Sequence, residues 1–374
     1  MSKTILIVAG ESSGDLHGSN LVSSLKSKAP DIKIIGAGGE KMRTAGVELI
    51  DDSTKYAAVG PFEAFAKFGR FAKLYRQLIS TIRTAKPDLA VLIDFPDFNL
   101  RFAHRLKDAG VPIVYYISPQ VWAWRPNRVN EIAKLVRKML VIFEFEKAIY
   151  DKAGVECEFV GHPLMDVLAN PAEFEGLREE LGIGKDELVI GMLPGSREKE
   201  VARIFPIMLD TAKIISRKFP QAKFLVAVAP DLDIELFKGT DTFSPKYELL
   251  KNRTYDVMYA SDLLLVASGT ATIEAAVMGR PEIITYRVNP LTAVLGYLLI
   301  KSKDLAMVNI IAGKRIMPEY YQWHAKPNNI AKEAIAIIEN GRLGKMSEEL
   351  SIVRSRLGSS GASGRAADAI LKLL

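Results

Sequence analysis

The stretch TILIVAGESSGD, residues 4–15, decides the fold of this chain. Its first six residues form a short apolar run that is typical of a strand buried on both faces. A turn rich in Gly and Ser follows, and a helical pattern starts near Leu16. A strand that enters a helix through such a turn presents free backbone N–H groups to a ligand at the carboxyl edge of a parallel sheet.

Two interpretations of residues 10–15 stay open. The turn binds a substrate, or it is an ordinary β-α turn in which Asp15 caps the helix. The second interpretation leaves Glu11, which stands beside two serines, unexplained. The spacing does not match G-x-G-x-x-G, so a dinucleotide is disfavoured and no cofactor is predicted.

The same alternation of apolar runs and helical patterns extends outward through the chain. Further strands are expected at 32–35, 89–93, 113–117, 139–142 and 158–160, and again at 188–193, 224–228, 263–266 and 282–285. A stretch rich in Pro, Gly and acidic residues, 170–185, separates the two sets. The predicted fold class is therefore α/β, with two Rossmann-like domains, 1–168 and 169–345, followed by C-terminal helices over 346–374.

Composition limits the class of protein. The chain of 374 residues carries a net charge of +6, which suits phosphates, nucleic acid or anionic lipid. The single cysteine, Cys157, excludes a disulfide framework and a multi-cysteine zinc site, and it favours a reducing compartment such as the cytoplasm. The longest apolar run, Leu291–Ile300, is too short to span a bilayer, so no membrane-crossing segment is expected.

Two carboxylates follow the strand predicted at 89–93. Asp94 and Asp97 flank Phe95 and Pro96, and either carboxylate is a candidate general base if burial raises its pKa. Alternatively, Asp97 caps a helix that begins near Asn99. A loop with two tryptophans, 118–125, follows the next strand and forms either a sugar or acyl pocket or a plain core corner.

The second half offers groups for a nucleotide. Ser196 and Arg197 close one strand with hydroxyl and guanidinium donors for a diphosphate, although Arg197 could instead pair with a nearby glutamate. The turn Ser268-Gly269-Thr270 leads into a helix that carries Glu274, an arrangement that suits phosphate and ribose but also fits a simple cap. Asp231-Leu232-Asp233 has the spacing of a metal site but is interpreted as a helix start, so no metal is predicted.

A helix over residues 60–80 is predicted to face a membrane. Its broad apolar arc lies opposite the basic residues Lys67, Arg70 and Lys73, as in interfacial helices. The alternative is a core helix with a solvated basic face. The residues expected to contact membrane or acyl chains are Phe62, Phe65, Phe68, Phe71, Leu74 and Leu78.

Taken in order, the motifs resemble those of lipid-A-disaccharide synthases over nearly the whole chain. They are GESSGD (10–15), PDFN (96–99), SPQVWAW (118–124), GHP (161–163), LPGSR (193–197), SGTAT (268–272) and Asn309. Their joint order and spacing are specific. The departures are Ser12, where Ala is commoner, and Met307-Val308-Asn309, where Leu-Pro-Asn is usual.

The resemblance implies an inverting, metal-independent glycosyltransferase of the GT-B type, with two Rossmann-like domains facing across a cleft. It would join UDP-2,3-diacylglucosamine to 2,3-diacylglucosamine 1-phosphate, giving the β-1,6-linked disaccharide 1-phosphate and UDP. The enzyme would be peripheral at the cytoplasmic face of the inner membrane, in contact with anionic lipid, and would bind no nucleic acid. The resemblance also implies that the C-terminal helices pack on the N-terminal domain, and it is compatible with a homodimer.

The resemblance also implies roles for individual residues. Asp97 would be the general base, while Glu11 and Ser13 would orient the sugars. His17 stays open as an alternative base, and its place at a helix start is expected to lower its pKa. The residues implied to hold the UDP-sugar are Arg197, Ser196, Ser268, Gly269, Thr270, Glu274, Asn309 and Gln322.

Two competing functions are weighed. A UDP-sugar epimerase or hydrolase on the same fold would have no need of the aromatic face of helix 60–80. A non-enzymatic protein that binds membrane surfaces would have no use for Glu11, Ser13 and Asp97 clustered at strand ends. UDP release, measured together with the dependence of solubility on detergent, would separate these functions.

Overall fold

The computed structural model describes residues 3–56, 61–124, 127–168, 174–237, 245–289 and 304–374, except for the side chains of residues 55–56, 61–68 and 123–124. The chain divides into two compact units. Unit 1 comprises Met1–Asp166 and Leu357–Leu374, and unit 2 comprises Val167–Arg356. The backbone therefore passes from unit 1 to unit 2 and back again, and each unit is described by itself.

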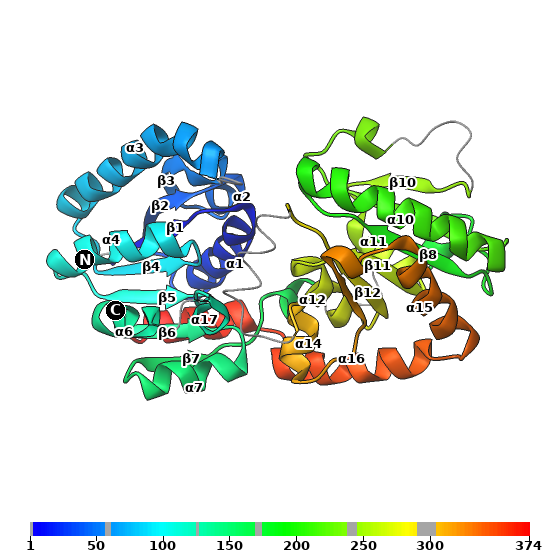
Figure 1. Cartoon of the computed structure of the whole chain (residues 1–374). Coiled ribbons are helices and arrows are strands. Elements are labelled where there is room, and N and C mark those ends of the chain that lie inside the picture. The colour runs from blue at the N-terminus through cyan, green and yellow to red at the C-terminus, as the bar shows by residue number, and fades with distance from the viewer. Residues whose placement is uncertain (1–2, 57–60, 125–126, 169–173, 238–244, 290–303) are drawn as a thin grey trace. The chain divides into compact units, whose positions relative to one another are not determined.

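Unit 1 contains a seven-stranded parallel sheet with the strand order β3-β2-β1-β4-β5-β6-β7 (Figure 1). Side chains of the two central strands, β1 and β4, are buried, as expected for a parallel sheet with covered faces. In register, Ile7 of β1 aligns with Gly36 on one side and Val91 on the other. The strands are β1 (Thr4–Ala9), β2 (Lys33–Gly38), β3 (Glu48–Asp52), β4 (Leu89–Ile93), β5 (Ile113–Tyr116), β6 (Lys138–Val141) and β7 (Glu156–Phe159).

Helices connect the strands of unit 1. Leu100, Phe102 and Leu106 belong to the core beside the sheet, which shows how apolar residues at helical spacing bury one face of a helix. The helical segments are α1 (Ser12–Lys28), α2 (Glu40–Thr44), η1 (Ser53–Tyr56), α3 (Pro61–Ala85), α4 (Pro96–Asp108), α5 (Val121–Trp124), α6 (Arg128–Leu135), α7 (Glu144–Lys152), α8 (Leu164–Val167) and α17 (Ala362–Leu371).

The last helix, α17, belongs to unit 1 and packs against α1 (Figure 1). Its N-terminus is held by Asp166, whose carboxylate accepts hydrogen bonds from the backbone N–H groups of Gly361, Ala362 and Ser363 at 2.6, 3.1 and 3.0 Å. These are the N–H groups that lack partners within a helix, so Asp166 caps α17 from a distant part of the sequence. Arg365 adds a hydrogen bond to the Val160 carbonyl at 2.8 Å.

Unit 2 contains a six-stranded parallel sheet with the order β10-β9-β8-β11-β12-β13. Its strands are β8 (Val189–Leu193), β9 (Lys223–Val228), β10 (Glu248–Lys251), β11 (Leu263–Ala267), β12 (Glu282–Tyr286) and β13 (Glu319–Tyr321). Its helical segments are α9 (Leu177–Glu180), α10 (Glu198–Lys218), η3 (Ile234–Phe237), α11 (Thr254–Ala260), α12 (Thr270–Val277), α14 (Met307–Ala312), η4 (Gln322–His324), α15 (Pro327–Glu339) and α16 (Leu343–Leu357).

The predicted α/β fold class with two parallel sheets is confirmed. The units divide after Asp166 and again after Arg356, where the sequence suggested boundaries after 168 and 345. The later return to unit 1 arises because α16 belongs almost entirely to unit 2, where the Ser347 hydroxyl donates a hydrogen bond to the Gly279 carbonyl at 2.7 Å. Among the described helices, none combines the length and apolar character that a bilayer span requires.

Candidate functional site

In unit 1, polar residues follow the carboxyl ends of β1 and β4, which are neighbouring strands. Glu11 and Ser13 are exposed at the start of α1, with Glu11 at the N-cap position. Because α1 begins at Ser12, the interpretation of Asp15 as the cap of a helix near Leu16 is wrong. The Asp15 carboxylate instead accepts hydrogen bonds from backbone N–H groups at the start of α2, including that of Gly39 at 2.7 Å.

The turn after β4 has an unusual backbone. Asp94 and Phe95 both have positive φ angles, 46° and 51°, which residues other than glycine rarely adopt. The Tyr115 hydroxyl and the Asn99 amide both donate hydrogen bonds to the Asp94 carbonyl, at 2.6 and 2.8 Å. The Phe95 ring lies so close to Gly10 that a Cβ added at Gly10 would stand 2.2 Å from it. The strained turn is thus fixed by its surroundings, as is common at functional sites.

Asp94 has the electrostatic properties of a base near neutral pH. Burial and the neighbouring Glu11 carboxylate raise the pKa of Asp94 to about 6, although part of the residue still reaches solvent. Both causes disfavour the charged form of the carboxyl group. A carboxylate with this pKa is ionised at pH 7 and is more basic than an ordinary aspartate.

Asp97 lies in a different environment, in the first turn of α4. Its side chain is 68% exposed, and its carboxylate forms an ion pair with the guanidinium of Arg128 from α6. The Asp97 carboxylate is therefore in contact with solvent and with a positive charge. The two carboxylates that the sequence singled out therefore differ in chemistry.

His17, the alternative base, lies near His162, with ring centroids 6.5 Å apart. Burial, with a smaller effect of Lys41, lowers the pKa of His17 to about 4, and burial lowers that of His162 to about 3. The pKa of His17 is thus low, as expected, and its main cause is burial. Both imidazoles are neutral at pH 7, and a pKa of about 4 makes His17 a weaker base than Asp94.

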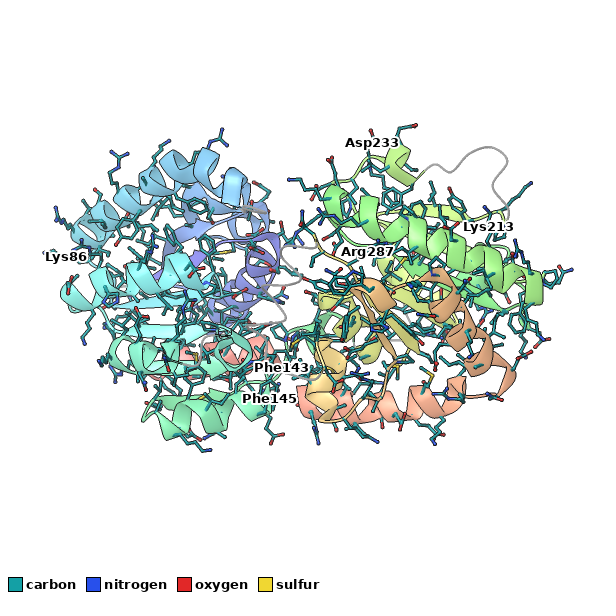
Figure 2. All side chains as sticks on the ribbon, in the orientation of Figure 1. Lys86, Phe143, Phe145, Lys213, Asp233 and Arg287 are labelled. Atoms are coloured by element: carbon teal, nitrogen blue, oxygen red, sulfur yellow. The ribbon has the colours of Figure 1, made fainter. Side chains whose placement is uncertain are left out.

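The tryptophan loop of unit 1 is anchored to α7. The Trp122 indole N–H donates to the Glu146 carboxylate at 3.3 Å, and the Ser118 and Tyr150 hydroxyls share a hydrogen bond at 2.7 Å. Burial raises the pKa of Glu146 to about 8, so this carboxyl group is largely protonated at neutral pH. Phe143 and Phe145, which flank the start of α7, stack with ring centroids 5.6 Å apart (Figure 2).

In unit 2, a cavity of about 710 Å³ opens at the carboxyl ends of β8, β9, β10 and β11. Five of the residues implied to hold a UDP-sugar line it: Ser196, Ser268, Gly269, Thr270 and Glu274. The cavity also includes the N-terminus of α12, where no side chain caps the backbone N–H groups. Such a helix end is suited to an anion.

Glu274 lies at the buried end of this cavity. Burial raises the pKa of Glu274 to about 7, and the Tyr255 hydroxyl lies 3.5 Å from its carboxylate. Arg197 is exposed at the N-cap of α10 and does not line the cavity. Burial raises the pKa of Glu200, a cavity residue, and the positive charge of Arg197 offsets part of that rise.

Asn309 and Gln322 lie outside the 710 Å³ cavity and use their side chains within unit 2. The Asn309 amide accepts from the N–H groups of Ile316 and Met317, at 2.8 and 2.9 Å, and donates to Met317 and Glu319. The Gln322 amide bonds with both the N–H and the carbonyl of Val288, at 3.1 and 3.2 Å. In this structure both amides therefore brace loops at the ends of strands.

Helix α3 contains the residues expected to face a membrane. The side chains of Phe62, Phe65 and Phe68 lie outside the described residues. Phe71 is partly buried and packs on Phe95 and Phe98, with ring centroids 5.9 and 6.2 Å apart. Leu74 and Leu78 are fully buried in the unit 1 core, so their predicted contact with membrane is wrong: they lie on the face of α3 that covers the sheet.

Residues 5–370 match the model of the family described as lipid-A-disaccharide synthetase. The chain belongs to this family. The lipid-A-disaccharide synthase of Syntrophus aciditrophicus is 42% identical over 376 residues, which cover 100% of this chain and 98% of that protein. The synthase of Myxococcus xanthus is 40% identical, with 99% of this chain and 97% of that protein covered.

Solved structures share the fold at low sequence identity. A co-structure of Staphylococcus aureus MnaA with UDP has a TM-score of 0.67 at 15% identity and covers 100% of this chain and 98% of its own. The glycosyltransferase of kitacinnamycin has a TM-score of 0.66 at 16% identity, with 100% of both chains covered. The UDP-GlcNAc 2-epimerase of Neisseria meningitidis, bound to UDP-GlcNAc, has a TM-score of 0.65 at 14% identity. The match covers 99% of this chain and 100% of that chain.

Membership of the lipid-A-disaccharide synthetase family confirms the predicted enzyme class and reaction. The protein is a glycosyltransferase that forms the lipid A disaccharide. Its likeness to epimerase structures is a likeness of fold alone and does not favour the alternative of an epimerase.

The structure also adds residues to the candidate site that the sequence did not single out. Phe174, Arg253 and Tyr255 line the unit 2 cavity. Arg253 and Tyr255 follow β10, whose sequence Glu248–Lys251 is too polar to predict a buried strand. Recognition of β10 as an edge strand would have placed them beside Ser268 and Glu274.

Proposed function

We propose that unit 2 binds UDP-2,3-diacylglucosamine by its nucleotide and that unit 1 activates the acceptor, 2,3-diacylglucosamine 1-phosphate. The observation that carries the proposal is the 710 Å³ cavity at the carboxyl edge of unit 2, because it combines an uncapped helix N-terminus, hydroxyl groups and a buried carboxylate. The products are the β-1,6-linked disaccharide 1-phosphate and UDP.

In this proposal the diphosphate binds at the start of α12. The backbone of Ser268–Thr270 and the Ser196 hydroxyl supply hydrogen bonds, and the helix end favours negative charge. Glu274 accepts hydrogen bonds from ribose hydroxyls in its ionised form. Arg197 stabilises the negative charge that develops on UDP as the bond to the sugar breaks.

The acceptor is activated by Asp94, in place of the preference for Asp97 that the sequence suggested. Asp94 takes the proton of the acceptor 6-hydroxyl, whose oxygen attacks the anomeric carbon of the donor. The bond between that carbon and the diphosphate oxygen breaks, and UDP leaves with the bonding electrons. The raised pKa of Asp94 supports this role, while the Asp97 carboxylate is occupied by Arg128.

The same proposal includes peripheral contact with an anionic membrane at the cytoplasmic face of the inner membrane. Both substrates carry acyl chains, so the enzyme must reach molecules that reside in a bilayer. The candidates for the contact are Phe62, Phe65 and Phe68, together with the basic residues of the same helix. The net charge of +6 favours an anionic surface.

The experiment that tests the proposal is UDP release from synthetic UDP-2,3-diacylglucosamine in detergent micelles, with and without the acceptor. Release that requires the acceptor and yields a disaccharide is the expected result. Release without the acceptor would indicate a hydrolase, and conversion of the donor without any release would indicate an epimerase.

A further inference from the structure

Unit 2 contains a second cavity, of about 590 Å³, that shares no lining residue with the nucleotide cavity. It lies between the first half of α10 and the turns that follow β12 and β13. Arg203, Pro206 and Ile207 come from α10, while Arg287, Trp323 and Lys326 come from the two turns. Figure 2 labels Arg287, which directly follows β12.

Hydrogen bonds and helix packing hold the walls of this cavity in place. The Gln322 amide joins the two turns through its pair of hydrogen bonds with Val288. The turn 322–326 is held by backbone hydrogen bonds from Ala325 to Gln322 and from Lys326 to His324, at 3.2 and 2.8 Å. Helices α10 and α15 pack together, with a salt bridge between Lys218 and Glu339 at 2.7 Å.

The cavity is positively charged. Arg203, Arg287 and Lys326 line it, and its described lining residues include no aspartate or glutamate. All three cations are exposed, and in the described part of the chain no salt bridge joins any of them to a carboxylate. Clustered cations without acidic partners attract a phosphate group.

An aromatic and apolar side accompanies the cations. Trp323 is 61% exposed, the most exposed large hydrophobic side chain among the described residues. Pro206 and Ile207 continue the apolar lining towards the interior. Tryptophan beside arginine and lysine is typical of surfaces that meet the headgroup region of a membrane, because the indole is amphipathic and the cations reach lipid phosphates.

We propose that this cavity binds the phosphate headgroup of an anionic membrane phospholipid, with Arg203 and Lys326 contacting the phosphate and Trp323 in the headgroup region beside them. The inference rests on the proposed contact with an anionic membrane and adds a headgroup site in unit 2. The nucleotide cavity has its own groups for the donor diphosphate, so Arg203, Arg287 and Lys326 are not needed there.

The test compares two double variants of the full chain that each remove two positive charges. Arg203→Gln with Lys326→Gln changes the cavity, whereas Lys251→Gln with Lys345→Gln removes exposed lysines elsewhere in unit 2. Co-sedimentation is measured with vesicles of phosphatidylglycerol in phosphatidylcholine and with phosphatidylcholine alone. We expect the cavity variant to lose on the order of 30-fold in partitioning to the anionic vesicles, and the control to lose much less.

Two further measurements distinguish the source of the phosphate. Anionic vesicles should shift tryptophan fluorescence to the blue, and Trp323→Phe should remove much of that shift, while inorganic phosphate should neither cause it nor reverse it. In detergent micelles without phospholipid, the cavity variant should keep the wild-type KM for the acceptor.

An equal loss of vesicle binding in both double variants would overturn the proposal, because net charge alone would then explain it. A raised acceptor KM of the cavity variant in micelles would also overturn it, because the cations would then belong to the substrate phosphate. A change of tryptophan fluorescence with inorganic phosphate would overturn it as well. Failure of the proposed function would instead appear as wild-type protein that releases no UDP, a result independent of vesicle binding.

Discussion

At the scale of single residues, Asp94 and Asp97 offer a matched pair of substitutions. Asp94→Asn keeps the shape of the side chain but removes the proton acceptor, and we expect kcat to fall by about 10²–10⁴-fold with little change in UDP affinity. Asp97→Asn removes the exposed charge that pairs with Arg128 and should lower kcat by less than about tenfold. The reverse order of effects, measured by UDP release, would return the role of base to Asp97.

The pH dependence of activity follows from the pKa of Asp94. Because the pKa is raised to about 6, the basic form dominates above pH 6 and is lost as the pH falls below it. We expect kcat/KM to rise with pH and to level off above about pH 7. The acidic limb should be absent from the residual activity of Asp94→Asn, and a limb that persists there would identify another group as the base.

Gly10 is predicted to be essential for the turn that carries Asp94. In Gly10→Ala the new methyl group would overlap the Phe95 ring, and overpacking of this kind costs about 1–3 kcal/mol. Gly14→Ala is the control. Gly14 lies within α1, and a Cβ added there would stand 3.4 Å from Ala9, which is an ordinary van der Waals distance. Thermal unfolding should show a lower Tm for Gly10→Ala alone, and a Tm equal to that of Gly14→Ala would contradict this account.

The sequence identified both carboxylates of the turn but did not show that their surroundings differ. Local patterns place Asp94 and Asp97 at a strand end, whereas their difference depends on Arg128 and Glu11, which come from distant segments. Asn309 illustrates the same limit. Its motif is recognisable, but the partners that occupy its amide are known only from the fold.

At the scale of elements, the capping of α17 by Asp166 should be measurable. Asp166→Ala leaves three backbone N–H groups without their partner, and loss of a cap costs about 1–2 kcal/mol. Asp368→Ala, also on the unit 1 surface, removes only an exposed ion pair with Lys28 and should change stability by less than about 0.5 kcal/mol. Denaturant titration of both variants provides the comparison.

The elements that the sequence predicted well are those with uniform burial. Strands β4 and β11 are continuous apolar runs that are buried throughout, and β1 is the same after Thr4, so their sequence alone identifies them. The strands that were missed, β3, β10 and β13, lie at sheet edges and contain charged residues such as Asp51 and Glu248. Edge strands face solvent, and their pairing depends on a neighbour that the sequence does not reveal.

At the scale of the whole molecule, UDP should stabilise the two units unequally. A ligand that binds only the folded form of unit 2 stabilises it by about 2.7 kcal/mol at a concentration one hundred times its Kd. Hydrogen exchange with UDP present should therefore slow in β8, β11 and α12, which line the nucleotide cavity. Slowing in α1 and β4 instead would contradict the assignment of the nucleotide to unit 2.

Part of the domain organisation of the molecule could be predicted from the sequence. The repeated alternation of strands and helices indicated two parallel sheets, and the acidic linker lies close to the first division after Asp166. The second division, after Arg356, falls within α16 near its last residue. A segment rich in Gly and Ser, 358–364, begins just after that point, but the contacts of α16 with unit 2 decide that the division lies there and not before residue 346.

The return of the chain to unit 1 has a consequence for how the protein is made. The first part of unit 1, up to Asp166, leaves the ribosome first, but α17, which packs against α1, leaves it only after all of unit 2 has emerged. Unit 2 is continuous in sequence and can complete its core during synthesis. Unit 1 must wait for α17, so the newly made chain exposes one face of α1 until α17 has been synthesised.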